Sequence, residues 1–189
     1  AANRARLTAL LPEAPCWLEQ VHGVDVAEFN DDRTRQGTQP MARADAAVTT
    51  RMHRVLAILT ADCLPVVLSD EAGSVLGVAH AGWRGLAAGV LENTVAVMRR
   101  NQGASSPLRA WIGPGISQAA FEVGPEVRAA FVEEEASTAV YFVGQKAGRH
   151  ISWNKWLADL PGLARHRLSA AGVDNIELCG HCSYHESAL

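Results

Sequence analysis

The sequence contains no apolar run long enough to cross a bilayer, which takes about 20 residues. Its longest apolar stretch, residues 55–68, is interrupted by Thr60, Asp62 and Pro65. Residues 1–11 also lack the apolar segment of a secretory signal. We therefore expect a cytoplasmic protein with no membrane partner.

Neither sign of charge dominates the sequence. The net charge is −3 over 189 residues, and Arg99-Arg100 is the one pair of adjacent basic residues. Such a chain has no cationic segment for the phosphates of nucleic acid, so we expect no nucleic-acid partner. With 48% hydrophobic and 20% charged residues, the composition is that of an ordinary globular domain.

Cysteine is scarce, with only Cys16, Cys63, Cys179 and Cys182. A chain of this length can bury a core without disulfides, so we expect reduced thiols. Cys179 and Cys182 have the Cys-x-x-Cys spacing of thiol oxidoreductases, but only seven residues follow, too few for the helix that such a motif needs. A metal site of these two residues with His185 would lack a fourth ligand. Cysteines that pack at the end of a strand are the preferred interpretation.

Periodicity predicts a mixed α/β (α+β) domain across residues 1–189. Amphipathic segments predict helices over residues 3–11, 86–100, 125–135 and about 159–171. Short apolar runs between turn residues predict strands over residues 16–22, 24–29, 46–50, 54–60, 64–69, 74–80, 108–112 and 139–143. The order of these elements shows no regular βαβ alternation.

Three of the apolar segments carry a metal-ligating side chain, namely His22, Cys63 and His80. Residues beside strands lie at the rim of a sheet, where rigid backbone positions side chains. Two imidazoles and one thiolate suit zinc or another borderline-soft metal, and three ligands leave a fourth position for water or substrate. Forty and then sixteen residues separate the three, so spacing alone leaves open the alternative of ordinary core residues.

Glycine-rich turns supply further candidates. Gly82 and Gly85 flank Trp83-Arg84 at a predicted helix start, where backbone N–H groups and Arg84 would favour an anion such as phosphate. A tight turn with glycines for steric reasons is the alternative. Gly113 could let the backbone approach a ligand, and Glu122 is either an acid/base group or a surface carboxylate.

The segments that carry these residues resemble, in order and spacing, the laccase-domain family, also called YfiH-like or peptidoglycan-editing-factor proteins. The resemblance covers nearly the whole chain. The motifs are Gln20-Val21-His22-Gly23, Ala44-Asp45-Ala46, Thr60-Ala61-Asp62-Cys63-Leu64-Pro65, His80-Ala81-Gly82-Trp83-Arg84-Gly85, Gly113-Pro114-Gly115-Ile116, Phe121-Glu122-Val123-Gly124 and Cys182-Ser183-Tyr184.

The resemblance implies a four-layer α/β/β/α arrangement with mixed sheets. It also implies a metal, usually zinc, bound by His22, Cys63 and His80. Family members usually have several dozen residues before the present start and an arginine-containing segment after the late Cys-Thr-Tyr element. We therefore expect a single domain that lacks segments at both ends.

The activities attributed to the family lead to our main functional hypothesis, a zinc-dependent enzyme that processes purine nucleosides. It would cleave adenosine, inosine, guanosine or methylthioadenosine with phosphate, and deaminate adenosine. We predict catalytic roles for Asp62, Arg84 and Glu122, and substrate or anion binding at Gln20, Gly82, Gly85 and Gly113. The expected partners are a purine nucleoside and phosphate, and the expected state is a monomer or small homo-oligomer.

Two other enzyme classes and a binding protein without catalysis are the alternatives. A copper-dependent polyphenol oxidase would need several coppers, whereas the chain has seven histidines and no His-x-His pair. A cysteine hydrolase with a role in peptidoglycan editing would use Cys63 as nucleophile and His80 as base. Because zinc-bound thiolate is poorly available for attack, the hydrolase and zinc hypotheses nearly exclude each other.

Overall fold

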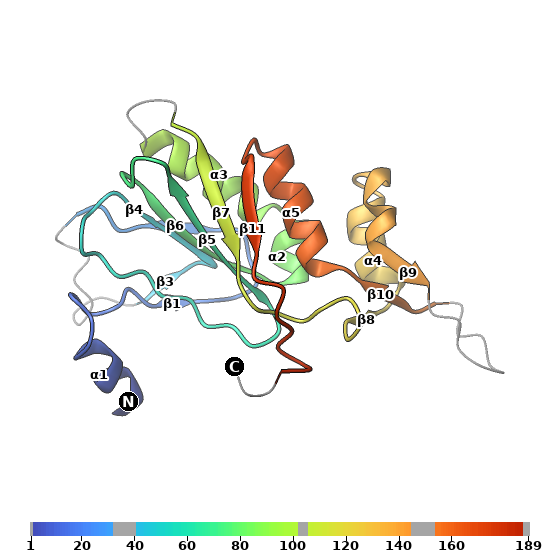
Figure 1. Ribbon diagram of the computed structural model, residues 1–189, viewed down its shortest axis with the longest axis horizontal. Coiled ribbons are helices and arrows are strands. Elements are labelled where there is room, and N and C mark those ends of the chain that lie inside the picture. Colours follow the sequence, from blue (N-terminus) through green and yellow to red (C-terminus); the bar gives the residue numbers. More distant parts are fainter. Residues whose placement is uncertain (1, 32–40, 102–105, 145–153, 187–189) are drawn as a thin grey trace.

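A computed structural model describes residues 2–31, 41–101, 106–144 and 154–186. Its centre is a six-stranded mixed sheet with the strand order β11-β7-β5-β6-β4-β2 (Figure 1). The inner pairs are antiparallel, and the outer pairs β2–β4 and β7–β11 are parallel. The strands are β2 (Val26–Glu28), β4 (Ala46–Thr49), β5 (Leu64–Asp70), β6 (Leu76–Ala81), β7 (Leu108–Ile112) and β11 (Asn175–Leu178).

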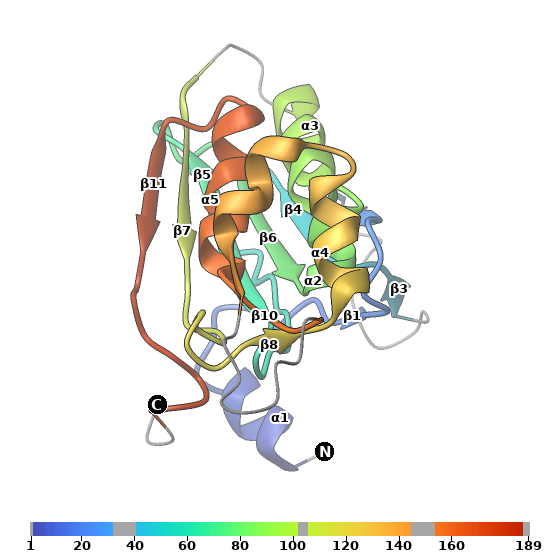
Figure 2. The same cartoon turned by 90° about the vertical axis from the view of Figure 1, so that its right-hand side faces the viewer.

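Helices cover one face of this sheet (Figure 2). They are α2 (Trp83–Ala87), α3 (Val90–Asn101) and α5 (Leu160–Ala170). Alternate residues of β5, such as Leu64, Val66 and Leu68, point into the main core with the apolar stripe of α3. The helix predicted over residues 86–100 is divided in two, because Gly89 adopts φ 98°, a left-handed conformation that an α-helix does not contain.

A smaller apolar cluster lies on the opposite face, over β4 and β6. There Ala47, Val67 and Val78 pack against the segments around Cys16–Leu18 and Leu56–Ile58. The parallel pair β1 (Leu18–Glu19) and β3 (Ala42–Arg43) belongs to this layer. The strand predicted over residues 54–60 is wrong, since this segment makes only an isolated bridge between Leu56 and Cys16. Its apolar residues cover the sheet face instead of joining a ladder.

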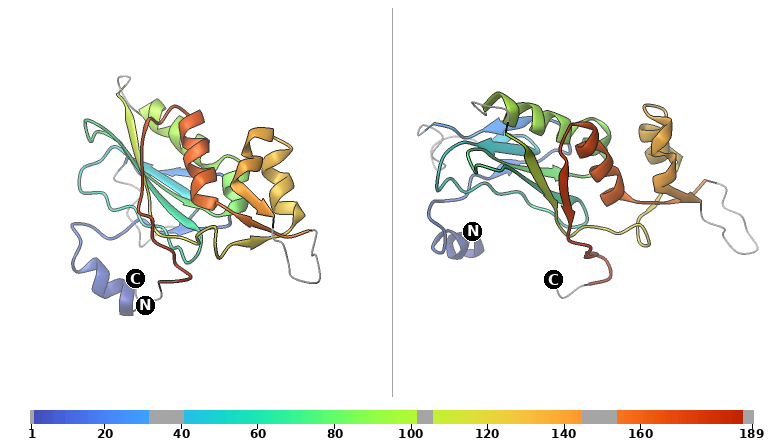
Figure 3. Two further views of the ribbon diagram at one scale, coloured as in Figure 1. Left: turned by 45° about the vertical axis from the view of Figure 1, so that its right-hand side comes forward. Right: turned by 45° about the horizontal axis from the view of Figure 1, so that its top comes forward.

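A third group of elements projects beyond α5 (Figures 1 and 3). It comprises the antiparallel sheet β8-β10-β9, helix α4 (Pro125–Val132) and a 3-10 helix over Ala136–Tyr141. The strands are β8 (Glu122–Val123), β9 (Phe142–Gly144) and β10 (Trp156–Ala158). The 3-10 helix occupies most of the strand predicted over residues 139–143, which is therefore wrong except at its end. Arg167 of α5 ties this group to the core through ion pairs with Glu134 and Glu92.

The α/β class with mixed sheets is confirmed, and β7 has the bounds that the sequence predicts. The helices, the six-stranded sheet and the thin layer with β1 and β3 account for three of the four layers that the resemblance implies. The N-terminal helix α1 covers Ala2–Thr8. Among the described residues, no helix combines the length and the hydropathy needed to span a membrane.

Candidate metal centre

The three predicted metal ligands converge at one edge of the six-stranded sheet, where β6 ends and β2, β4 and β5 begin. One nitrogen each from His22 and His80 and the sulfur of Cys63 all lie within 4.8 Å of one another. Cys63 Sγ lies 3.9 Å from His22 Nε2. The two imidazole rings meet edge to face with centroids 4.8 Å apart. His22 is exposed, Cys63 is half-buried and His80 is buried.

Strand register explains this convergence. The β5–β6 ladder pairs Leu64 with Ala81, so one further step places Cys63 opposite Gly82 and next to His80. The β4–β6 ladder pairs Ala46 with Ala79, and its next step places Asp45 opposite His80, whose N–H donates to the Asp45 carbonyl at 2.7 Å. Side chains on opposed residues of neighbouring strands lie on the same face of the sheet. Two ligands and one carboxylate are thus brought together by backbone pairing.

The Asp45 side chain is fully buried and makes four hydrogen bonds. Its Oδ1 accepts from His80 Nδ1 at 2.9 Å and from the backbone N–H of His22 at 3.0 Å. Its Oδ2 accepts from the backbone N–H groups of Val21 at 3.0 Å and Gly23 at 2.7 Å. Burial by itself acts to raise the pKa of Asp45, but the bonds from His80 and the backbone outweigh it, and the pKa is lowered. The carboxylate is therefore charged at neutral pH.

The sequence interpretation did not assign Asp45 a role in the site. A signal was present, because Asp45 is the one charged residue in the apolar run 44–48. A carboxylate inside a buried strand needs hydrogen-bond donors to offset the loss of water. The identity of those donors, however, depends on which strand lies beside β4.

The two glycines predicted to bind an anion allow close approaches within the site. A Cβ atom on Gly82 would lie 2.8 Å from Cys63 Sγ and 3.0 Å from His22 Cδ2. A Cβ atom on Gly85 would lie 2.8 Å from the carbonyl oxygen of Gly23. These distances support the steric interpretation of both glycines, and anion binding stays a prediction.

The predicted catalytic residues occupy three different surroundings. Asp62 is exposed beside Cys63, and its Oδ1 accepts a hydrogen bond from Ser183 Oγ at 2.8 Å. Arg84 is exposed, with its guanidinium carbon 4.5 Å from the centroid of the ring of the neighbouring Trp83. Glu122 lies in β8, in the three-stranded sheet, and pairs with Lys155 Nζ at 3.2 Å. Only Asp62 is adjacent in sequence to a ligand, and the catalytic roles stay predictions.

The remaining predicted positions, Gln20 and Gly113, contact other parts of the chain. The Gln20 amide accepts from the Leu59 N–H at 2.7 Å and donates to the Leu59 carbonyl at 2.8 Å. These two hydrogen bonds hold the segment that leads to Cys63 beside the segment that leads to His22. Gly113 lines a separate cavity of about 160 Å³ together with Cys179.

The donor types suit a metal ion such as zinc, and the three donor atoms, now within 4.8 Å of one another, would draw closer on binding it. With Zn–N bonds of about 2.0–2.1 Å and Zn–S bonds of about 2.3 Å, a tetrahedral site places sulfur about 3.6 Å from nitrogen. The observed separation between Cys63 Sγ and His22 Nε2 is 3.9 Å. The Asp45 carboxylate accepts from His80 Nδ1, as carboxylates do behind metal-bound histidines. Burial raises the pKa of the Cys63 thiol, and the carboxylates of Asp62 and Asp45 raise it further, so a cation is what would favour its thiolate.

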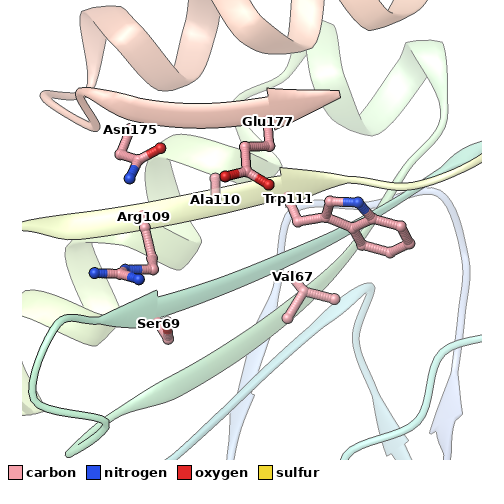
Figure 4. Close-up of a pocket in the computed structure, with 7 residues that line it drawn as sticks. All are labelled: Val67, Ser69, Arg109, Ala110, Trp111, Asn175 and Glu177. Atoms are coloured by element: carbon pink, nitrogen blue, oxygen red, sulfur yellow. The ribbon is translucent and has the colours of Figure 1, made fainter. Parts of the chain in front are cut away.

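A cavity of about 210 Å³ lies away from these ligands, on the face of β5, β7 and β11 opposite to the helices (Figure 4). Trp111 is its largest lining residue and is 41% exposed. None of the predicted site residues lines this cavity. Its lining residues are Val67, Ser69, Arg109, Ala110, Trp111, Asn175 and Glu177.

The late Cys-x-x-Cys segment has no disulfide, because Cys179 and Cys182 are both free thiols. Cys182 is buried, and its Sγ accepts from the Ser117 N–H at 3.4 Å. Hydrogen bonding from Ser117 lowers the pKa of Cys182 to about 6. Across the described ranges, these residues and His185 form no ligand group like the one above.

Comparisons with known proteins identify the family of the chain and its relatives. The family model described as multi-copper polyphenol oxidoreductase laccase matches residues 1–189. A purine nucleoside phosphorylase of Xylella fastidiosa is 47% identical over 187 residues, which cover 94% of this chain and 66% of that protein. The purine nucleoside phosphorylase YfiH of Escherichia coli is 43% identical, with 98% and 71% covered. The chain thus spans about two thirds of the length of these relatives.

Two solved structures have the same fold. The YfiH protein of Bacillus licheniformis superposes with a TM-score of 0.84 at 25% identity, covering 98% of this chain and 71% of that one. YlmD of Geobacillus stearothermophilus superposes with a TM-score of 0.79 at 31% identity, covering 99% and 71%.

Proposed function

Because this chain belongs to the laccase-domain family, we propose that it is a zinc-dependent enzyme that processes purine nucleosides. The observation that carries the proposal is the convergence of His22, Cys63 and His80 within 4.8 Å, with the partly exposed Cys63 and exposed His22 open to a substrate. Relatives that are 43% and 47% identical are named purine nucleoside phosphorylases. Their names support the substrate class.

Zinc bound by these three residues would supply a Lewis acid and lower the pKa of a bound water to about 7. The residues of the chain supply orientation and proton transfer. Asp45 holds His80 through Nδ1, and Gln20 holds the segment that leads to Cys63 through both polar atoms of its amide. Asp62 is exposed beside Cys63 and is the carboxylate that we assign to proton transfer. Glu122, paired with Lys155 in the other sheet, becomes the second choice.

Phosphorolysis is the first reaction that we propose. An oxygen of phosphate forms a bond to C1′ of the ribose, the C1′–N9 bond to the purine breaks, and the departing base receives a proton. The exposed guanidinium of Arg84 is suited to bind the phosphate by two parallel N–H···O bonds. Replacing it in Arg84→Ala is expected to weaken phosphate binding and phosphorolysis together. Unchanged values of both would contradict the role of Arg84.

Deamination of adenosine is the second reaction that we propose. Water replaces the 6-amino group of the purine, and ammonia leaves. This reaction needs no phosphate, so the two reactions are separable in one assay.

The test combines metal analysis with product analysis. The purified chain is loaded with zinc and incubated with adenosine, with and without phosphate, and the products are separated by chromatography. We expect adenine only with phosphate, inosine without phosphate, and inosine together with hypoxanthine from its phosphorolysis with phosphate. Absence of both inosine and hypoxanthine would refute deamination. His80→Ala should remove the bound zinc and both products, whereas Glu177→Gln, in the distant cavity, should change neither. Absence of every product from zinc-loaded protein would refute the proposed function.

A copper-dependent polyphenol oxidase is the alternative that the family description favours. Reduction of oxygen by four electrons needs several coppers, and the described residues contain one group of three ligands. Turnover of a phenol by copper-loaded protein, with zinc-loaded protein inactive on nucleosides, would support this alternative.

A cysteine hydrolase that acts on peptidoglycan is the other alternative, and the Asp45–His80 hydrogen bond beside Cys63 favours it. A nucleophilic Cys63 would need its proton removed, but burial raises the pKa of this thiol. The hydrogen-bond contact of its sulfur, at 3.9 Å, is with His22 Nε2, whereas the predicted base is His80. Hydrolysis that survives thorough removal of metal would support this alternative.

A further inference from the structure

We propose that Asp45 is a positioning residue that assembles the metal centre before an ion arrives. It fixes the tautomer of His80 and the backbone turn of His22, and so prepares two of the three ligands with one carboxylate. The inference rests on the proposed function for the identity of the ion. It concerns this chain's own hydrogen bonds, which can be tested with no metal present.

The first step is the saturation of the carboxylate. Asp45 is fully buried, and its two oxygens accept four hydrogen bonds, one from an imidazole and three from backbone N–H groups. A buried carboxylate needs such donors to offset its lost hydration. Since each oxygen already accepts two hydrogen bonds within the chain, we assign neither of them to substrate binding. The function of Asp45 is therefore exerted through the residues it holds.

The second step concerns the nitrogen with which His80 binds. Ionised Asp45 only accepts hydrogen bonds, so the contact of 2.9 Å requires the proton of neutral His80 to be on Nδ1. Nε2 is then left with its lone pair, the state that a metal ion requires. Because His80 is only 4% exposed, water cannot readily provide an alternative partner for Nδ1.

The third step concerns His22. This residue has φ 58°, a left-handed conformation that costs about 1–2 kcal/mol for a residue with a side chain. The N–H groups of Val21, His22 and Gly23 all donate to Asp45, at 2.7–3.0 Å. These bonds stabilise the turn that brings His22 Nε2 within 3.9 Å of Cys63 Sγ. The same carboxylate thus determines the position of a second ligand.

Asp45→Asn provides a specific test because an amide cannot serve both sets of donors. With its oxygen toward His80, its NH₂ group would face the N–H groups of Val21 and Gly23, which are also donors. With its oxygen toward those two groups, its NH₂ would donate to His80 Nδ1 and drive the proton to Nε2. The second orientation satisfies more bonds, so we expect the His80 tautomer to switch. Such a switch blocks the nitrogen that would bind the ion.

Asp25→Asn is the matched control. Asp25 directly precedes β2, its backbone carbonyl accepts from the Asp45 N–H at 3.1 Å, and its side chain is exposed, so the same chemical change can be made there without altering a buried carboxylate. Both variants lose one negative charge near the metal centre. Only Asp45→Asn alters the hydrogen bonds of His80 and of the His22 turn.

The experiment uses the whole chain, freed of metal and labelled with ¹⁵N on histidine. At about pH 8, where imidazoles are largely neutral, ¹⁵N NMR distinguishes protonated from bare ring nitrogens. We expect His80 with a bare Nε2 in the wild type and in Asp25→Asn, and a bare Nδ1 in Asp45→Asn. Zinc affinity, measured by competition with a coloured chelator, should fall about 10- to 100-fold in Asp45→Asn and stay unchanged in Asp25→Asn.

The wild-type spectrum can be recorded whether or not a variant folds, and it alone decides the tautomer of His80. A protonated Nε2 in metal-free wild type, or an Asp45→Asn variant that keeps both its tautomer and its zinc affinity, would overturn the inference. If the wild type shows the expected tautomer but binds no zinc, the proposed function fails while the role of Asp45 in ordering His80 stands.

Discussion

Replacing Gly82 with alanine separates metal binding from folding. The backbone of Gly82, at φ −75° and ψ 160°, is one that alanine adopts without strain. The added Cβ would lie 2.8 Å from Cys63 Sγ, whereas nonbonded heavy atoms make their best contacts at about 3.5–4.0 Å. The overlap is roughly 1 Å, and relief is available because the sulfur is at the end of a side chain that can rotate about χ1.

Rotation of Cys63 would relieve the overlap with its sulfur, and a small shift of the exposed His22 ring would relieve the contact of 3.0 Å with Cδ2. The rotation would withdraw the sulfur from the other two ligands. We therefore expect the unfolding free energy of the metal-free Gly82→Ala variant to change by less than about 1 kcal/mol, since alanine also restricts the unfolded chain. Overpacking costs of about 1–3 kcal/mol would instead reduce zinc affinity, by about 5- to 150-fold.

Competition with a coloured chelator measures the zinc affinity, and urea titration of the metal-free protein measures the stability. Gly144→Ala is the control, because a Cβ there has its nearest neighbour, an atom of Trp156, at 3.9 Å. Zinc binding by Gly82→Ala as tight as that of the wild type would refute the proposed crowding of Cys63.

The remaining predictions concern stability. Asp70 is buried, which acts to raise its pKa, but bonds from Ser74 Oγ, Ser74 N–H and Val75 N–H outweigh burial and lower the pKa. The contribution of the Asp70 carboxylate to stability is therefore complete above the unfolded pKa of about 3.9 and is lost as pH falls through the lower folded pKa. In urea titrations from about pH 6 to pH 2, the unfolding free energy should fall less for Asp70→Asn than for the wild type. Arg167→Ala leaves Glu92 without its buried cation and should cost about 3 kcal/mol in a urea titration, against no measurable loss for the exposed Arg165→Ala. Zinc at about 1,000 times its dissociation constant should add about 4 kcal/mol to the unfolding free energy of the wild type, and a chelator should remove that gain. His80→Ala should show no gain with zinc and no change with the chelator.

Strands and helices with a complete local pattern were predictable. In β7, Leu108, Ala110 and Ile112 alternate with exposed residues, so period and bounds both follow from the sequence. The segment 54–60 has a similar apolar content but covers a sheet face, a role that depends on what lies beneath it. The break at Gly89 could not be predicted, because an isolated glycine within a helical pattern is tolerated at a modest cost and does not by itself mark a break.

For the candidate site, residue types were predictable and their connections were not. The types and motifs around His22, Cys63 and His80 led to the ligand set, which the structure brings together. Asp45 was overlooked because its partners come from another strand and from a loop more than 20 residues away. Hydrogen bonds of this kind depend on which strands and loops lie side by side in the folded chain, and hydrophobic periodicity does not predict that arrangement.

The pairing of β6 with β4 and β5 has a kinetic consequence. Shifting either ladder by one residue would move a strand by about 3.3 Å and turn its side chains to the other face, which would separate Cys63 or Asp45 from His80. An ion therefore cannot find these donors in a partly registered chain. During refolding, zinc uptake should follow the completion of this three-strand core, and the loss of zinc from a coloured or fluorescent chelator in the solution would time that late event.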